Sequence, residues 1–338
     1  MTTTAARGAS IETRNPATGE VLRTYETHDR AAVGARLDAA VAAAERWAET
    51  PFAERAERMR AAARTLRERK PALAELATRE MGKPLAEAEA EVEKCAVSCE
   101  WFAANGERFL ISEEHPSNAT RSYVAFRPLG VLLAIMPWNF PYWQVFRAAA
   151  PAFMAGNVVV LKHASNVTGC ALAIEDVFRA SGFPDGAFSM LLVESKSMEP
   201  IVADERVAAV TLTGSEGAGS SVGAAAGKAI KKTVMELGGS DYFIVLADAD
   251  LEKAAEVGVK ARFQNTGQSC IAAKRFIVED SVYERYAELF VERTRALKVG
   301  DPMDRATQIG PLARTDLRDT LAEQVRDTVR AGAKLLLG

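Results

Sequence analysis

The stretch VLLAIM, residues 131–136, opens a series of short apolar runs continued by VVVL (158–161), AFSMLLV (187–193) and AAVTL (208–212). These runs are apolar on both faces, as strands buried inside a parallel sheet must be. Segments with helical spacing alternate with them, at 142–154, 168–181, 197–204 and 216–226. Strand–helix alternation of this kind predicts an α/β fold with a doubly wound, Rossmann-like layer.

The flanking sequence predicts further units. Between His28 and Phe109 the chain has helical spacing, and Pro51, Pro71 and Pro84 divide it into separate helices. Residues 115–130 break this pattern and predict a projecting hairpin. A second α/β unit begins near Leu237, with strand patterns at 242–247 and 275–279 around a helix at 250–263. We therefore predict a first domain of residues 1–114 and 131–236, an arm of residues 115–130, and a second domain of residues 237–338.

Composition excludes several classes of protein. The chain has 338 residues, of which 48% are hydrophobic and 26% charged, and its formal net charge is −3. Disordered and fibrous classes are excluded by these proportions, and nothing in the charge favours nucleic acid. No apolar run is long enough to span a membrane. The first sixteen residues lack the apolar core of a secretory signal, and four scattered cysteines are typical of reduced thiols in a cytoplasmic protein.

Two apparent motifs in the glycine-rich segment, a P-loop and a serine-hydrolase elbow, do not meet the requirements of those motifs. Gly223–Lys228 is one residue short of a P-loop and follows a helix. Ser221 sits in a G-x-S-x-G sequence, but it lies inside the predicted helix and no histidine follows His163, so a serine hydrolase of that family is excluded. The preceding turn, TGSEGAG at 213–219, follows a strand and opens a helix, and by itself fits either a tight turn or a phosphate-binding turn.

One thiol differs from the others. Cys270 ends the polar loop NTGQSC, where reactive groups are commonly displayed, whereas Cys95, Cys99 and Cys170 fit buried structural positions. A histidine base downstream of Cys270 does not exist. The carboxylate candidate is Glu236, which stands among apolar residues and glycines, where we expect desolvation to raise its pKa towards that of a general base. The scattered His and Cys residues give no metal-ligand spacing.

A third segment, PWNFP at 137–141, closes the first buried strand. The carboxyl ends of parallel strands are where such folds bind ligands, and an amide fixed between two prolines suits stabilisation of an oxyanion. A rigid aromatic turn explains this segment equally well.

Taken together, PWNFP, the strand end at Lys162, TGS-x-x-x-G, ELGG and GQ-x-C resemble the aldehyde dehydrogenase superfamily in order and spacing. Within it the chain is most similar to the NAD(P)-dependent succinate-semialdehyde dehydrogenases. The resemblance implies a cofactor-binding first domain, an oligomerisation arm and a catalytic second domain. It also implies oxidation of a small aldehyde by NADP or NAD, and a homodimer or homotetramer.

The resemblance also implies roles for residues. Cys270 would be the nucleophile, Asn139 an oxyanion donor, Glu236 the base that activates water, and Arg147 a ligand of the substrate carboxylate. Gln264 takes the position at which many of these enzymes place a second carboxylate-binding arginine. Cofactor binding would fall to Pro137, Trp138, Lys162, Ser165, Gly214, Ser215, Gly219, Leu237 and Gly238. Serine rather than glutamate at position 165 removes a charge that would repel a 2′-phosphate, so NADP is permitted.

The chain ends at Gly338, where the family continues, so we expect a truncated sequence. Two hypotheses follow. In one, the protein is an NAD(P)-dependent dehydrogenase of succinate semialdehyde or another small aldehyde. In the other, it is a non-catalytic fragment that retains nucleotide binding.

Overall fold

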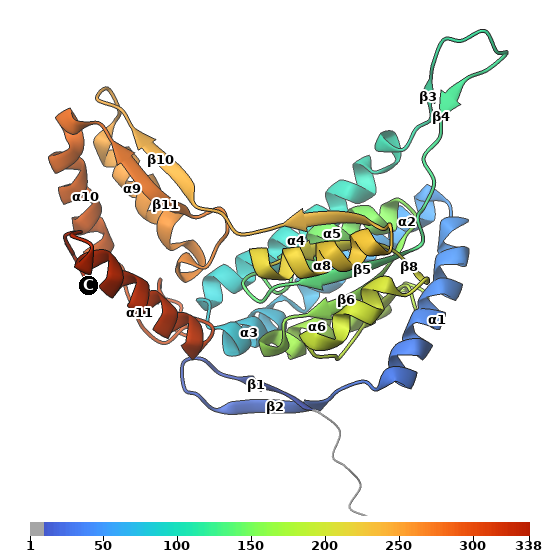
Figure 1. Cartoon of the computed structure of the whole chain (residues 1–338), viewed down its shortest axis with the longest axis horizontal. Helices are drawn as coiled ribbons and strands as arrows, with labels where there is room; N and C mark the ends of the chain where they lie inside the picture. The colour runs from blue at the N-terminus through green and yellow to red at the C-terminus, as the bar shows by residue number, and fades with distance from the viewer. Residues whose placement is uncertain (1–9) are drawn as a thin grey trace, which may run out of the picture.

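The computed structural model describes residues 10–338 and has one wholly parallel, five-stranded sheet at its centre (Figure 1). The strands are, in spatial order, β7 (Phe188–Met190), β6 (Val158–His163), β5 (Val131–Met136), β8 (Val207–Thr213) and β9 (Lys232–Glu236). All residues of β6 are buried, which confirms the interpretation of the apolar runs as interior strands. Strand β9 was not predicted, because its sequence KTVME lies at the exposed edge of the sheet.

Helices cover both faces of this sheet. They are α5 (Trp143–Met154), α6 (Thr168–Ala180), α7 (Met198–Ala203) and α8 (Glu216–Lys228). The strand order reverses after β7, because the chain crosses back past β5 to form β8. Right-handed crossovers then place α5 and α6 on one face and α7 and α8 on the other. The predicted doubly wound architecture is confirmed.

Proline punctuates the amino-terminal helices as the sequence predicted. The helices are α1 (Arg30–Ala48), α2 (Phe52–Glu68), α3 (Lys70–Met81) and α4 (Leu85–Asn105). Pro51 and Pro84 immediately precede α2 and α4, and Pro71 lies in the first turn of α3, where a missing N–H costs nothing. Helix α4 packs against α2, α3 and α5, so one of its faces lies inside the main core. An antiparallel hairpin, β1 (Ser10–Arg14) with β2 (Val21–Glu26), precedes these helices.

A second antiparallel hairpin follows α4. Strands β3 (Glu113–Glu114) and β4 (Tyr123–Val124) form it, and Figure 1 shows it standing away from the body.

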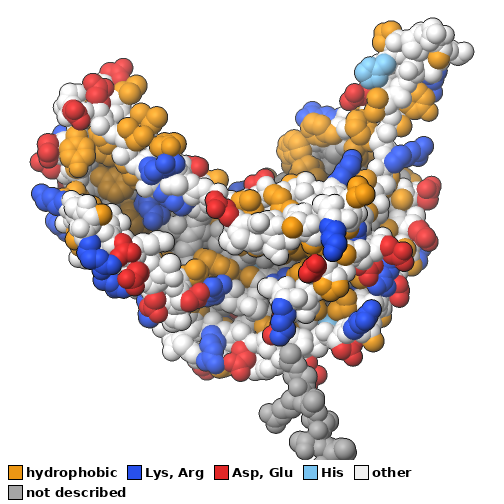
Figure 2. All heavy atoms as spheres, in the orientation of Figure 1, with side chains coloured by type: hydrophobic (Ala, Val, Ile, Leu, Met, Phe, Trp, Pro, Cys, Tyr) orange, Lys and Arg blue, Asp and Glu red, His pale blue; other side chains and the backbone are white. Residues whose placement is uncertain are grey.

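The last part of the chain forms a smaller α/β unit. Strands β10 (Asp241–Val245) and β11 (Ala273–Val278) pair in parallel, and α9 (Leu251–Phe263) and α10 (Tyr283–Arg295) pack together beside them. Its core is separate from the main one and centres on Val245, Ala255, Tyr286 and Leu289. A final helix, α11 (Thr315–Arg330), has no buried residue. Figure 2 shows a crescent, with this unit at one tip and the β3–β4 hairpin at the other.

Candidate active site

A nucleotide-sized pocket lies at the carboxyl end of the parallel sheet. It has a volume of about 480 Å³, and residues from β6, from the turn Ser195–Ser197 with α7, and from α8 line it, among them Lys162, Ser195 and Val222. The Nζ of Lys162 donates to Ser195 Oγ at 3.2 Å. Burial lowers the pKa of Lys162, and none of the described residues supplies a charge that opposes this shift. A buried cation with a single hydroxyl partner, facing a pocket, fits the binding of a polar group such as a ribose or phosphate.

The turn between β8 and α8 allows a ligand to approach the backbone closely. Ser215 caps α8, because its Oγ accepts the N–H of Ala218 at 3.3 Å. Gly214 donates its N–H to the carbonyl of Glu236 at 3.0 Å. At Gly219, a Cβ would lie 2.6 Å from Cδ2 of Leu237, so a larger residue there would require the Leu237 side chain to move. The positive end of α8 is therefore presented at the pocket edge, where it would attract a phosphate.

The other predicted cofactor positions are less enclosed. Ser165 is exposed in the turn after β6, and its carbonyl accepts the hydroxyl of Thr168 at 2.8 Å. Gly238 is exposed with open space around it. Pro137 and Trp138 are half-buried at the end of β5, where Trp138 packs against the main core.

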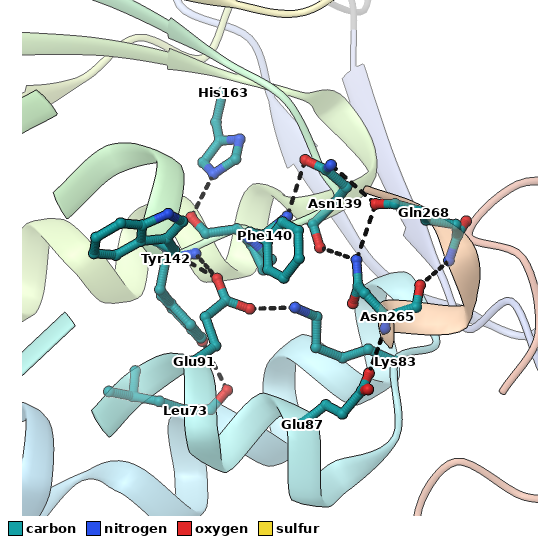
Figure 3. Close-up of polar contacts among 12 residues, drawn as sticks. Leu73, Lys83, Glu87, Glu91, Asn139, Phe140, Tyr142, His163, Asn265 and Gln268 are labelled. Atoms are coloured by element: carbon teal, nitrogen blue, oxygen red, sulfur yellow. Dashed lines mark hydrogen bonds and ion pairs between the residues drawn. The ribbon is translucent and has the colours of Figure 1, made fainter. Parts of the chain in front are cut away.

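The turn that carries Asn139 is fixed from below by buried polar groups (Figure 3). Glu91 of α4 accepts the backbone N–H groups of Tyr142 and Trp143, both at 2.8 Å. His163 donates its Nε2–H to the carbonyl of Pro141 at 2.8 Å, while its Nδ1 accepts a backbone N–H. These bonds fix the tautomer of His163, and burial lowers its pKa to about 4.

A buried lysine completes the support beneath the Asn139 turn. Lys83, which is fully buried, forms an ion pair with Glu91, and its Nζ lies 4.4 Å from the ring centroid of Phe140. Glu87, one helical turn before Glu91, accepts the N–H of Asn265 at 2.9 Å. Burial raises the pKa of the Glu87 carboxyl, and the charge of Lys83 opposes that shift.

The loop before Cys270 has an unusual backbone. Asn265 and Thr266 both have a φ of 57°, and Gly267 has a φ of 74°. Left-handed conformations are sparsely populated by non-glycine residues, above all by β-branched ones, and they persist where surrounding contacts hold them. After Cys270, the Nζ of Lys274 donates to the carbonyls of Ser269, Cys270 and Ala272 at 2.8, 2.9 and 3.2 Å. The nucleophile candidate therefore sits in a turn that is held on both sides.

Cys270 is the accessible thiol. It lies in a pocket of about 190 Å³ that Arg147, Gln264, Lys94 and Trp143 also line. Cys95, Cys99 and Cys170 are fully buried, and burial raises the pKa of each. The distinction drawn from the sequence between Cys270 and the other three thiols agrees with this burial.

Glu236 does not have the surroundings that its neighbouring sequence suggested. The expectation of a desolvated carboxylate was wrong, because Glu236 ends the edge strand β9 and its side chain is 49% exposed. Its Oε1 lies 3.0 Å from Nη2 of Arg147, which is itself 36% exposed. The structure thus joins the predicted base to the predicted substrate ligand in an exposed ion pair.

Several polar residues near the site were missed from sequence: Lys83, Glu87, Glu91, Lys94 and Lys274. The sequence did contain a pattern that indicates two of them, Glu87 and Glu91. The face of α4 that carries Cys95 and Cys99 continues towards the amino terminus, at the same spacing of four, through Glu91 and Glu87. Carboxylates on a buried helix face require buried partners. Among residues 10–338, no group of three His, Cys, Asp or Glu side chains is arranged to hold a metal ion.

Comparison with known proteins gives the family. Residues 3–338 match the model of the aldehyde dehydrogenase family. The chain belongs to this family. A Mycobacterium avium relative named succinate-semialdehyde dehydrogenase [NADP(+)] is 52% identical over 336 residues, covering 97% of this chain and 70% of the relative. A Mycobacterium tuberculosis relative named succinate-semialdehyde dehydrogenase [NADP(+)] 1 is 51% identical over 335 residues, covering 97% of this chain and 72% of the relative.

Solved structures support the same family membership. The succinic semialdehyde dehydrogenase of Streptococcus pyogenes, in complex with NADP+, superposes with a TM-score of 0.94 and 36% identity, covering 97% of this chain and 72% of that one. Within the part of this aldehyde dehydrogenase that the structure describes, no helix is both long and apolar enough to cross a bilayer.

Proposed function

We propose that this protein oxidises a small aldehyde bearing a carboxylate, with succinate semialdehyde as the substrate and NADP+ as the hydride acceptor. The observation that carries the proposal is one pocket that holds an accessible thiol, Cys270, together with two cationic side chains, Arg147 and Lys94. The names of the Mycobacterium and Streptococcus relatives support the same substrate and cofactor.

The first chemical step belongs to Cys270 and Asn139. The thiolate adds to the carbonyl carbon and forms a thiohemiacetal whose oxygen carries negative charge. One N–H of the Asn139 side-chain amide is bonded to the carbonyl of Gln268 at 3.0 Å, which leaves its second N–H for that oxygen. Hydride then leaves the former aldehyde carbon, and NADP+, when bound, supplies the acceptor.

The second step releases the acid. The thioester left on Cys270 requires a water molecule and a base, and Glu236 is the carboxylate we assign to this role. Its ion pair with Arg147 is exposed, and such pairs contribute only about 0–1 kcal/mol. Glu236 therefore separates from Arg147 at little cost, which frees the arginine for the substrate carboxylate and the glutamate for water. Metal chemistry has no role in this scheme.

Cofactor binding would fall to the pocket at Lys162. Lys162 and Ser195 offer a buried cation and a hydroxyl, and the amino terminus of α8 at Ser215 would bind the pyrophosphate of the cofactor. Serine at position 165 leaves room and no negative charge for a 2′-phosphate, which favours NADP over NAD.

We also assign the β3–β4 hairpin to assembly of a homodimer or homotetramer. Tyr123 and Val124 of β4 and Phe126 just after it are 43–49% exposed, and exposed apolar side chains on a projecting hairpin favour association. We place the protein in the cytoplasm because all four cysteines are free thiols.

The function is tested by the absorbance of reduced cofactor. The purified chain, supplied with NADP+ and succinate semialdehyde, is expected to generate NADPH, and Cys270→Ser is expected to abolish this. Cys99→Ser is the matched control, because that thiol is buried away from the pocket. Turnover by Cys270→Ser would reject the nucleophile. NADP+ binding by calorimetry without any turnover by the unmodified chain would instead support a binding fragment.

A further inference from the structure

The structure assigns a positioning role to Glu87, a residue of helix α4 that lines the Cys270 pocket and whose carboxylate binds the backbone of the loop before Cys270. This inference rests on the proposed function, since it concerns how Asn139 is aimed at the oxyanion. The contacts run from Glu87 to Asn265 and from Asn265 to both Asn139 and Gln268 (Figure 3). Glu87 would thereby set the geometry between the oxyanion donor and the loop of the nucleophile.

The first contact fixes a strained backbone. The Oε2 atom of Glu87 accepts the N–H of Asn265 at 2.9 Å, although the two residues are 178 positions apart in sequence. Asn265 is 1% exposed and begins the run of left-handed residues that leads towards Cys270. A buried N–H without an acceptor is costly, so this carboxylate supports the conformation directly.

The second contact transmits that placement to the oxyanion donor. The Nδ2 of Asn265 donates to the carbonyl of Asn139 at 2.8 Å and to that of Gln268 at 3.1 Å. Gln268 lies two residues before Cys270, and its carbonyl also accepts a hydrogen bond from Nδ2 of Asn139 at 3.0 Å. Meanwhile Oδ1 of Asn139 accepts the N–H of Phe140 at 3.1 Å, so the amide orientation is fully determined.

Helix α4 serves as a common frame for the two loops. Glu87 holds the Cys270 loop, and Glu91, four residues later on the same face, holds the turn that contains Asn139. Both carboxylates come from one rigid helix, so the distance between the loops is set by the helix rather than by either loop. Catalysis is sensitive to displacements of about 1 Å in such groups.

The test compares Glu87→Ala with Glu87→Gln, because the glutamine Oε1 can accept the same N–H and alanine cannot. Glu93→Ala is the matched control on the exposed face of α4. Four quantities are measured: kcat, KM for succinate semialdehyde, the Kd of NADP+, and the rate at which iodoacetamide labels each cysteine, read by peptide mass spectrometry. The thiol readout requires no turnover.

For Glu87→Ala we expect kcat to fall by roughly 10- to 100-fold, below the full loss of an oxyanion donor, with KM and the Kd of NADP+ within about twofold. Labelling of Cys270 should rise by about threefold or more as its loop loosens, while Cys95, Cys99 and Cys170 stay unlabelled. Glu87→Gln should regain most of the turnover, and Glu93→Ala should match the unmodified chain.

Two results would overturn the role of Glu87. One is turnover and labelling in Glu87→Ala equal to those of the unmodified chain. The other is parallel labelling of all four cysteines in both Glu87 variants, which would show a purely structural contribution. Absence of NADPH formation by the unmodified chain would contradict the proposed function instead, and the labelling of Cys270 would still decide whether Glu87 holds its loop.

Discussion

The two walls of the candidate site are built in opposite ways. The wall that carries Asn139 and Cys270 rests on buried polar groups, and the side chains of the Lys83–Glu91 ion pair are 0% and 2% exposed. The other wall carries Arg147 and Glu236, whose side chains are 36% and 49% exposed. One wall is therefore fixed by the fold, while the other is solvated and free to rearrange.

This difference matches the two chemical demands of the proposed reaction. Stabilising an oxyanion requires donors that are already oriented before charge develops. Activating water on a thioester, and then releasing an acid, requires groups that change partners. A buried network suits the first task and an exposed ion pair suits the second.

The largest effect that tests the difference between the two walls is expected from removing the buried cation, Lys83. Lys83→Met leaves Glu91 buried without its partner and near a second carboxylate, so we expect the free energy of unfolding to fall by about 3–5 kcal/mol. Lys70→Met is the control, because Lys70 pairs with Glu93 at the surface and should cost about 0–1 kcal/mol. Urea denaturation of both variants measures the difference. Equal costs would mean that the buried wall is no more fixed than the surface.

A smaller effect is expected from pH, through His163. Its folded-state pKa, about 4, lies below the unfolded value near 6.5, so the unfolded chain binds the extra proton first as pH falls. The stability contributed by neutral His163 is present above pH 6.5 and is lost between pH 6.5 and about 4, amounting to roughly 2–4 kcal/mol. Unfolding free energies of the unmodified chain and of His163→Asn, measured across this range, should differ in slope. Parallel curves would exclude His163 as the source.

The smallest expected effect concerns the exposed wall. Arg147→Met removes a charge-assisted contact to the substrate carboxylate, worth about 1.5–3 kcal/mol, and should raise KM for succinate semialdehyde roughly 10- to 100-fold. KM for butanal, which lacks the carboxylate, should change by less than about twofold. Steady-state kinetics with both aldehydes give the comparison. Equal increases would assign Arg147 to holding Glu236 rather than to substrate recognition.

Sequence reasoning succeeded where local pattern and burial coincide. The strand predicted at 131–136 has the observed bounds of β5, and the prolines before α2 and α4 separate helices as expected. It failed for β9, whose exposed residues carry no apolar run, and for the exposure of Glu236, which depends on the edge position of that strand. The support from Lys83 and Glu87 was also missed, because charged residues on a helix are typical of a solvated face and their partners lie in distant loops.

The central claim is that Cys270 carries the acyl group while Glu236 acts afterwards. The direct test uses Glu236→Gln, mixed once with NADP+ and succinate semialdehyde, quenched in acid and digested for mass spectrometry. We predict a succinyl thioester on the peptide that contains Cys270, formed in equal amount to NADPH. Reduced cofactor accompanied by no acyl group on Cys270, or by an acyl group on Cys95, Cys99 or Cys170, would contradict it.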